Sequence, residues 1–350
     1  MLTMPRDTVA SGPAPAHPGA ARRRLPLIEA FLLVLLMVLP LALPDYLMAL
    51  GTRVLILSLL ALSFDLIWGF AGIMSFGHAV FFGAAGYLAA VLSRDFGVAE
   101  LLVAAPLAML AGLVLSLLIS GFLLLGRHLV TLVFVSLGTL TMAYAAERLA
   151  RGMYFLGGQN GIPSIASPTL SGTQISEGPP LYYLALAVLL AAYAMCRWMV
   201  RSQFGLALVG MRESEGRMAF FGYRVPHMKA LVFCASGALA GLAGCLYAFN
   251  EGFVGPGMLG VVTSTQIVLY VLLGGAGTLA GAVLGVIAIE GASFWLADRY
   301  PQAWPVILGL LMLAVVLFRP AGLISLMVSS RERTGSFAPH PERRPDHGAA

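Results

Sequence analysis

Long apolar runs separated by short polar breaks dominate the chain from residue 25 onward. A helix needs about 20 apolar residues to cross the hydrocarbon core of a bilayer, and most of these runs are close to that length. We therefore predict about ten membrane-spanning helices, at residues 25–43, 53–68, 69–91, 101–125, 129–146, 181–200, 229–249, 263–273, 279–296 and 304–327. The pattern indicates an all-α, polytopic membrane protein, in which the runs 69–91 and 263–273 are candidates for broken or re-entrant segments.

The two ends of the chain lack this pattern. Residues 1–24 are rich in Pro, Ala and Gly, and residues 329–350 are charged and contain proline. Such segments bury too little apolar surface to fold, so we predict two disordered tails. Residues 25–328 form the predicted transmembrane domain, with a long loop at 147–180 and a charged loop at 201–228.

Composition excludes a soluble globular protein. Charged residues make up 11% of the chain and hydrophobic residues 59%, whereas a soluble domain carries about 25% charged residues. The mean hydropathy is +0.89. The three cysteines lie in apolar runs without metal-ligand spacing, so we interpret them as buried apolar side chains and expect no metal site.

Basic residues give the predicted orientation, because cytoplasmic ends of membrane helices carry an excess of Lys and Arg. With the amino terminus inside, 16 of the 21 cations fall inside and 5 outside. This assignment puts both termini and the 201–228 loop in the cytoplasm. The outside set is Arg53, Arg94, Arg148, Arg151 and Arg299. The cations sit at the ends of apolar runs and form no basic, aromatic-rich face, so we expect membrane lipid and no nucleic acid as a partner.

A weak internal repeat marks a candidate solute path. Residues 69–72 resemble residues 274–277, and each copy follows one apolar run and opens another. Matched glycine-interrupted segments in two halves of a chain indicate a transport site at their interface, although glycine also recurs by chance in so apolar a sequence. The residues that we predict to line this path are Asp65, Gly72, Ser75, Phe76, Gly77, His78, Gly274, Gly275, Gly277 and Thr278.

Two polar residues of this path have alternative interpretations. A carboxylate at bilayer depth costs about 2.5–3.5 kcal/mol, so Asp65 should face the protein interior or have a partner. It can serve the path or only a structural hydrogen bond near a helix end. His78 can contact the solute, but we favour a structural hydrogen bond near the gate.

The 201–228 loop is the predicted contact for a soluble partner. Its charged residues precede a short apolar stretch that a glycine can cap, which is typical of an amphipathic helix docking in a groove. The residues assigned to this coupling helix are Arg212, Glu213, Ser214, Glu215, Phe220, Phe221 and Gly222. The alternative is a solvated loop kept positive for topology alone.

No catalytic motif is present. The sequence holds no P-loop GxxxxGK[ST], no HExxH and no GxSxG. We therefore expect no enzymatic activity and no cofactor on this chain, and any energy from ATP must come through another subunit.

Four segments, in the same order, resemble the signature of the LivM-type permeases of branched-chain amino acid ABC importers. They are residues 65–87, 157–163, 202–247 and 274–281, and the resemblance covers about residues 50–325. It implies a type II importer permease with a two-half, inverted-repeat-like core that alternates access under ATPase control. Phe220 and Phe221 stand where smaller or polar residues are frequent in the family, which leaves the substrate open.

The resemblance also implies a location and partners. We expect the bacterial plasma (inner) membrane, a second, LivH-like permease subunit, two cytoplasmic ATPase subunits and an extracytoplasmic solute-binding protein. The 201–228 loop would dock the ATPase. Similar permeases move urea or short amides, and that alternative stays open. A further alternative is a stand-alone secondary transporter or channel, with Asp65, His78 and Glu290 as ion or proton groups.

Overall fold

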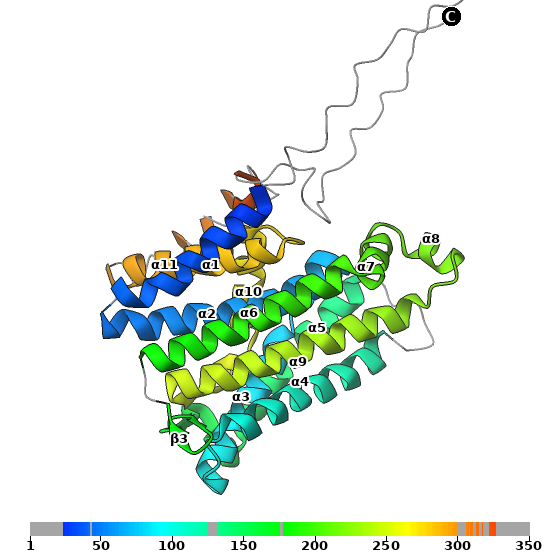
Figure 1. Cartoon of the computed structure of the whole chain (residues 1–350). Helices are drawn as coiled ribbons and strands as arrows, with labels where there is room; N and C mark the ends of the chain where they lie inside the picture. Colours follow the sequence, from blue (N-terminus) through cyan, green and yellow to red (C-terminus); the bar gives the residue numbers. More distant parts are fainter. Residues whose placement is uncertain are drawn as a thin grey trace, which may run out of the picture.

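The structure is a computed structural model that describes residues 24–42, 44–124, 132–175, 178–299, scattered positions between 306 and 317, and 322–326. The main helices are α1 (Arg24–Ala42), α2 (Asp45–Asp65), α3 (His78–Phe96), α4 (Leu101–Leu123), α5 (Leu132–Gly152), α6 (Pro179–Arg201), α7 (Gln203–Glu213), α8 (Glu215–Phe220), α9 (Val225–Glu251), α10 (Val261–Gly274) and α11 (Leu279–Arg299) (Figure 1). The two predicted tails, apart from residue 24, and half of the span predicted at 304–327 lie outside the described residues.

Short elements fill the connections. A π-helix, η2 (Leu66–Phe70), continues α2, and 3-10 turns occupy η3 (Tyr154–Leu156), η4 (Gly158–Asn160), η5 (Pro256–Leu259) and η6 (Leu323–Leu326). The strands are β1 (Ile162–Pro163), β2 (Thr169–Leu170), β3 (Thr173–Gln174) and β4 (Phe253–Val254). The strand β1 pairs antiparallel with β4, and β2 pairs antiparallel with β3.

Six of the described helices are long and apolar enough to cross a membrane, which confirms the predicted all-α, multi-pass class. They cover Leu47–Phe70, His78–Phe96, Leu101–Leu123, Pro179–Arg201, Val225–Glu251 and Leu279–Leu296. The helix α10 is apolar but has only 14 residues. It is therefore shorter than the roughly 17–25 residues that span a bilayer. The count of about ten spans stays a prediction.

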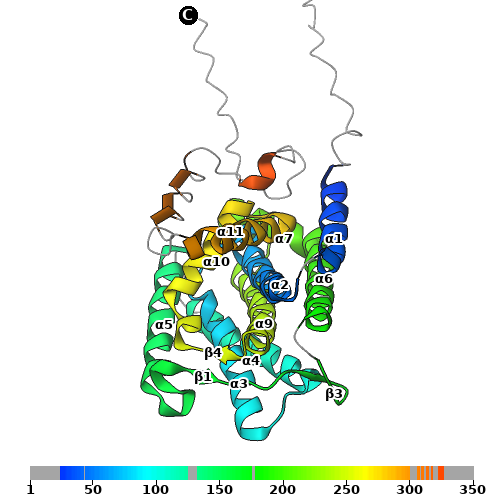
Figure 2. The same ribbon diagram turned by 90° about the vertical axis from the view of Figure 1, so that its left-hand side faces the viewer.

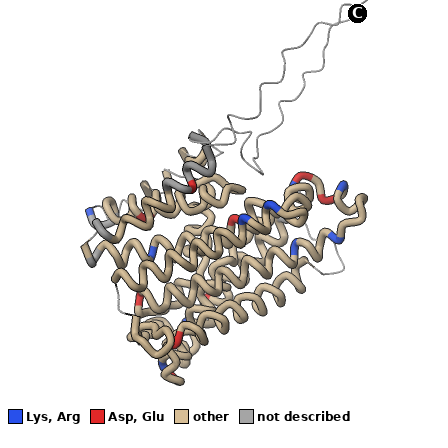
Figure 3. Tube along the Cα trace, in the orientation of Figure 1, with Lys and Arg blue, Asp and Glu red and all other residues tan. Residues whose placement is uncertain are grey.

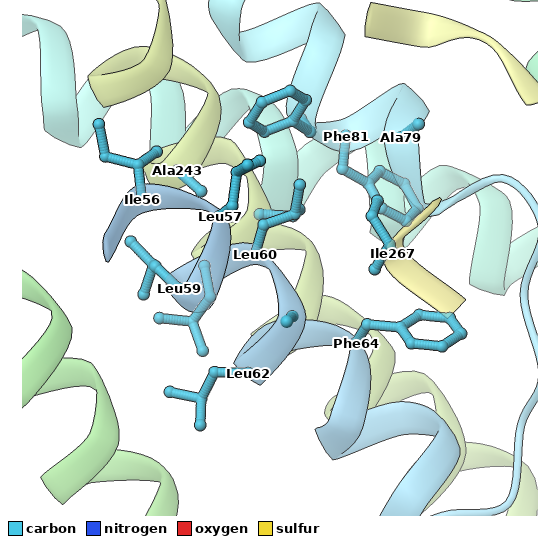
Figure 4. Close-up of a cluster of buried hydrophobic side chains, with 14 of the residues drawn as sticks. Ile56, Leu57, Leu59, Leu60, Leu62, Phe64, Ala79, Phe81, Ala243 and Ile267 are labelled. Atoms are coloured by element: carbon cyan, nitrogen blue, oxygen red, sulfur yellow. The ribbon is translucent and has the colours of Figure 1, made fainter. Parts of the chain in front are cut away.

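Helices α2 and α9 form the centre of the bundle. In the span Leu47–Phe70, which contains most of α2, 67% of the most apolar stretch is buried, and in α9 the share is 72%. The corresponding share is 28% in both α4 and α6. In the view along the bundle, α2 lies between α6, α9, α10 and α11 (Figure 2). Its side chains leave the helix in several directions, toward α3, α9 and α10 among others (Figure 4). A helix that is apolar all round belongs in such a central position.

Glycine allows the closest helix crossings around α9. A Cβ atom added to Gly241 of α9 would lie 3.3 Å from Gly112 Cα of α4, and one added to Gly86 of α3 would lie 3.2 Å from the Gly244 carbonyl oxygen. Small residues permit this approach in lipid, where van der Waals packing between helices contributes much of the association energy. These crossings fix α3 and α4 against the central helix.

The two ends of the bundle differ. Helices α7 and α8 extend from one end, and the β2–β3 hairpin lies at the other (Figure 1). Charged residues gather around α7 and α8 (Figure 3). At the opposite end, the β1–β4 pairing holds the loop after α5 against the end of α9.

Several predicted boundaries were wrong. Helix α2 begins at Asp45 and not at residue 53, so Arg53 lies inside the helix and not at its start. The loop predicted to begin at residue 147 begins later, because α5 continues to Gly152. The Arg151 guanidinium, 2.6 Å from the Glu147 carboxylate one turn earlier, supports this extension. The single coupling helix predicted within 201–228 is two helices, α7 and α8, which meet at Ser214. The Ser214 backbone is extended and its hydroxyl accepts a hydrogen bond from the Arg217 N–H, so it starts a new helix.

Candidate functional site: two glycine bends and the helix that joins them

The first bend interrupts the predicted span 69–91. Helix α2 ends at Asp65, η2 continues to Phe70, and the chain is then non-helical from residue 71 until α3 begins at His78. Gly72 adopts a φ of 73°, which glycine reaches without the steric cost of a side chain. The predicted break therefore lies at 71–77, inside the glycine-rich run.

Hydroxyl groups from other helices stabilise this irregular backbone. Ser136 of α5 donates to the Met74 carbonyl at 2.8 Å, and Thr139 of α5 accepts from the Phe76 N–H at 3.1 Å. Ser264 of α10 accepts from the Ala79 N–H at 3.3 Å. A backbone N–H or C=O left without a partner in a bilayer costs several kcal/mol, so the bend is stable only because these hydroxyl groups supply hydrogen bonds.

The second bend contacts the first. It joins α10 to α11 at residues 275–278, where Gly275 and Gly277 have φ values of 118° and 80°. The Gly277 N–H donates to the Asp65 carboxylate at 2.7 Å. A Cβ atom on Gly69 would lie 2.7 Å from Gly277 Cα, which leaves no room for one. The segments that the repeat paired are thus in direct contact, and both are largely buried.

Arg212 of α7 inserts into the first bend. Its guanidinium donates to the Gly69 carbonyl oxygen, and its side chain crosses the face of Gly72, where a Cβ atom would lie 2.9 Å from Arg212 Cγ. An electrostatic attraction also links it to Asp65. A cation at the carbonyl end of a helix is favoured by the helix dipole. Arg212 is half-buried, because it points into the bundle and away from solvent.

His78 lies inside an aromatic cluster. Its imidazole is fully buried, with ring centroids 5.4 Å from Phe64 and 5.6 Å from Phe81. The Ser63 hydroxyl donates to the Leu60 carbonyl at 2.6 Å, so His78 Nε2–H donates to Ser63 Oγ at 2.8 Å. This bond joins α3 to α2 just before the first bend.

The other predicted path residues fall into two groups. Ser75, Phe76 and Gly77 lie in the break against α5, where the Ser75 hydroxyl accepts from the Gly77 N–H at 3.3 Å. Gly274 ends α10, and Gly275 and Thr278 lie in the second bend. There the Thr278 hydroxyl donates to the Gly275 carbonyl at 2.6 Å.

The predicted coupling residues also separate. Arg212 and Glu213 end α7, whereas Glu215 begins α8 and lies 2.6 Å from the ammonium of Lys229 in α9. Phe220 and Phe221 are 91% and 74% exposed. Gly222 ends the element with a φ of 87°. The α7–α8 element therefore exposes two aromatic side chains to the outside and directs Arg212 into the bundle.

Sequence reasoning missed the residues that support the bend. Ser63, Ser136, Thr139 and Ser264 are hydroxyl residues in apolar helices, and they carry no motif. The spacing of Ser136 and Thr139, one helical turn apart, was the available signal. Among the described residues, no group of three or more His, Cys, Asp or Glu side chains could hold a metal ion.

Comparison with known proteins identifies a matching family. The family described as "Branched-chain amino acid transport system / permease component" matches residues 46–316. The chain is 27% identical over 302 residues to the high-affinity branched-chain amino acid transport system permease protein LivM of Escherichia coli, covering 79% of this chain and 69% of LivM. It is 24% identical over 286 residues to the corresponding protein BraD of Pseudomonas aeruginosa, covering 76% and 91%.

A third relative has a different named solute. The chain is 30% identical over 206 residues to the autoinducer 2 import system permease protein LsrC of Klebsiella pneumoniae, covering 56% of this chain and 57% of LsrC. No solved structure matches the chain significantly.

Proposed function

Because this chain belongs to the family of branched-chain amino acid transport permease components, we propose that it forms the solute path of an ATP-driven importer for branched-chain or related amino acids. The resemblance predicted from its motifs is confirmed by the family match. One observation carries the proposal for its mechanism: Arg212 connects the charged α7–α8 element to the point where the two glycine bends meet.

The α8 element is the proposed docking surface for the ATPase. Its exposed Phe220 and Phe221 extend beyond the bundle, where large apolar side chains are costly unless a partner covers them. The ion pair between Glu215 and the buried Lys229 fixes α8 to the start of α9. A movement of the partner against α8 would therefore reach the bundle through short, rigid contacts.

Arg212 is the proposed connection from this surface to the path. It is anchored at the Gly69 carbonyl, and Gly69 lies against Gly277 of the other bend. Because Arg212 holds Gly69, a shift of α7 would move Gly69 relative to Gly277 and change the separation of the bends. Closely packed interfaces of this kind move between discrete arrangements. Asp65 and the second-bend residues Gly277 and Thr278 lie at or next to this contact, whereas Ser75, Phe76 and Gly77 lie against α5. We propose that alternating access operates at the contact between the bends.

The proposed orientation places α7 and α8 in the cytoplasm, together with both termini, as the charge distribution predicts. The proposed partners are a second permease subunit, two ATPase subunits that bind ATP, and an extracytoplasmic solute-binding protein in the bacterial plasma membrane. The relatives LivM and BraD, matched over most of this chain, favour leucine, isoleucine and valine as the substrate class. The LsrC match covers less of the chain and shows that related permeases serve other solutes.

A stand-alone secondary transporter would use ionisable groups along the path to carry ions or protons. Asp65, His78 and Glu290 each have a hydrogen bond to another helix or bend within the described residues, which is sufficient for structural roles. The family match favours the ATP-driven importer over this alternative.

The decisive experiment is co-purification with the neighbouring gene products, followed by uptake into proteoliposomes. Replacing both aromatic residues (Phe220→Ser with Phe221→Ser) should release the ATPase subunit and abolish ATP-driven leucine uptake. Tyr154, which is 98% exposed at the opposite end of the bundle, provides the matched control. The Tyr154→Ser variant should retain the ATPase.

Two results would contradict the proposal. One is an aromatic double variant that keeps the ATPase and its uptake. The other is gradient-driven amino acid flux by the purified chain alone, without any ATPase, which would instead support the secondary-transporter alternative.

A further inference from the structure

A cluster of charged residues joins three helices away from the glycine bends. Arg53 of α2 has its Nε atom 3.9 Å from the Glu251 carboxylate of α9 and 3.7 Å from the Glu290 carboxylate of α11. The Arg53 guanidinium also lies over the ring of Tyr247, 5.9 Å from its centroid. We call Arg53, Glu251 and Glu290 the charged triad. It brings three of the membrane-spanning helices together, yet the coupling proposed above makes no use of it.

Glu290 is fixed by α10. The Tyr270 hydroxyl donates to its carboxylate, and the Gln266 amide donates to the same oxygen at 3.3 Å and to the Tyr270 hydroxyl at 2.7 Å. Glu290 is only 4% exposed. One acid of the triad is therefore buried and held in place by two side chains of a fourth helix.

The other two members of the triad are accessible. The side chain of Arg53 is 39% exposed and that of Glu251 is 29% exposed. Arg53 lies six residues into the span that starts at Leu47, about 9 Å along the helix. Charged side chains within membrane spans are rare and generally face the protein interior or a water-filled cavity, which makes Arg53 a candidate for a solute or ion pathway.

The hydrogen-bonding capacity of the triad is incomplete. The Arg53 Nε atom is buried but has no hydrogen-bond partner among the described residues. The Glu251 carboxylate accepts a hydrogen bond from the Asn250 amide at 3.2 Å. A carboxylate can accept several hydrogen bonds, so this contact uses only part of its capacity. One cation faces two anions, so the triad offers a spare donor and an excess of negative charge.

A cavity of about 230 Å³ adjoins one member of the triad, Glu251; Arg53 and Glu290 are not among its lining residues, and Arg53 lies next to it over the ring of Tyr247. Glu251 and Tyr247 line it, together with Phe253, Gly255, Gly257 and Met258. It is smaller than the roughly 300–1,000 Å³ pockets that hold drug-sized ligands, which suits a small solute. Its wall combines a carboxylate, two aromatic rings and a thioether.

We propose that the charged triad is a contact site for the zwitterionic head of an α-amino acid on its way through the permease. The guanidinium of Arg53 would bind the solute carboxylate, and Glu251 would bind its ammonium. Glu290 would position Arg53 through their ion pair. A simple carboxylate without an ammonium is disfavoured by the excess negative charge. This proposal depends on the proposed function, because it assigns residues to the amino acids that the importer moves.

The test uses the complete importer in proteoliposomes and measures the initial rate of leucine uptake against concentration. Arg53→Gln and Glu251→Gln should each lower maximal uptake about tenfold or more, the effect of losing a hydrogen bond to a charged group. ATP hydrolysis and subunit assembly should persist. Arg53→Lys should have an intermediate rate, because lysine keeps the charge but loses the planar fork.

Arg94 supplies a matched control. It lies at the end of α3, its side chain is 37% exposed, and it pairs with Asp95 at 2.6 Å. Arg94→Gln should leave uptake near that of the unmodified importer. Unchanged uptake in both triad variants would overturn the proposal. So would a loss of uptake matched by a loss of thermal stability that Arg94→Gln does not show, because the triad would then only hold helices together.

Failure of the proposed function gives a different result. If the unmodified importer moves no amino acid when ATP is supplied, both proposals fail. If it does, and the triad variants are normal, only the triad proposal fails.

Discussion

The contact between the two glycine bends can be tested with one methyl group. In a Gly69→Ala variant, the new Cβ atom would lie 2.7 Å from Gly277 Cα, and closer still to Gly277 N and to an Asp65 carboxylate oxygen. The two Gly277 contacts are backbone atoms that cannot rotate away, and a movement of the Asp65 side chain would itself take that carboxylate from its partner. The bends must therefore separate, which breaks the 2.7 Å hydrogen bond from the Gly277 N–H to Asp65.

Two terms give the expected magnitude. Forcing a methyl group into a closely packed site costs about 1–3 kcal/mol, and a buried polar group that loses its hydrogen bond costs about 1–3 kcal/mol more. Replacing glycine inside a helix returns about 0.5–1 kcal/mol, because alanine loses less backbone entropy on folding. The net loss in the free energy of unfolding is then about 1–5 kcal/mol.

The matched control is Gly291→Ala in α11. A Cβ atom there meets nothing within 4 Å, so the same substitution should be neutral or slightly stabilising. Thermal unfolding of both purified variants in the same detergent measures the difference. If Gly69→Ala unfolds at the same temperature as Gly291→Ala, the bends are not in close contact and the argument fails.

Two further predictions concern single hydrogen bonds. Ser63→Ala should lower the free energy of unfolding by about 1–3 kcal/mol, because the buried His78 N–H loses its partner; Ser58→Ala, which removes a bond only to a carbonyl of its own helix, should be nearly neutral in the same thermal assay, and equal losses would refute the assignment. Glu100 lies at the end of the bundle opposite α7 and α8. Hydrogen bonds lower its pKa below the usual 4.5, the strongest from the Thr169 hydroxyl and the others from the backbone N–H groups of Ser171 and Gly172 in the β2–β3 hairpin. The loop is therefore held to Glu100 above pH 4.5 and released as the pH falls through the lowered pKa, which a spin label on the loop should report as increased mobility in acid; Glu100→Gln should remove this pH dependence.

The sequence predicted most helices because bilayer thickness limits their length. The predicted spans 181–200 and 279–296 differ by only a few residues from α6 and α11. The break at 71–77 could be suspected from its glycines but not placed, because the groups that stabilise it come from distant segments. Ser264, for example, bonds a backbone N–H at Ala79, 185 residues earlier in the chain. No local pattern of residues contains that information.

Arg212 illustrates the same limit for the site. Its charge and position in a cytoplasmic-type loop predicted an outward-facing docking residue. In the structure its side chain points inward, because Gly72 leaves room for it and the Gly69 carbonyl accepts a hydrogen bond from its guanidinium. The docking role proposed for the loop therefore falls to Phe220 and Phe221, whose exposure was not predictable from the apolar stretch that contains them.

The two bends differ in a way that bears on how movement passes through the protein. The second is a tight turn between two helices, whereas the first contains the non-helical segment 71–77, held by hydroxyl groups that can exchange partners. We therefore expect the first bend to be displaced more easily than the second, and it is also the bend that Arg212 contacts. A shift of α7 should displace the first bend while the second stays in place. Gly69→Ala separates the bends without altering α8, so it should impair uptake while the ATPase remains bound; loss of the ATPase from that variant would show that the bends support the docking surface and do not respond to it.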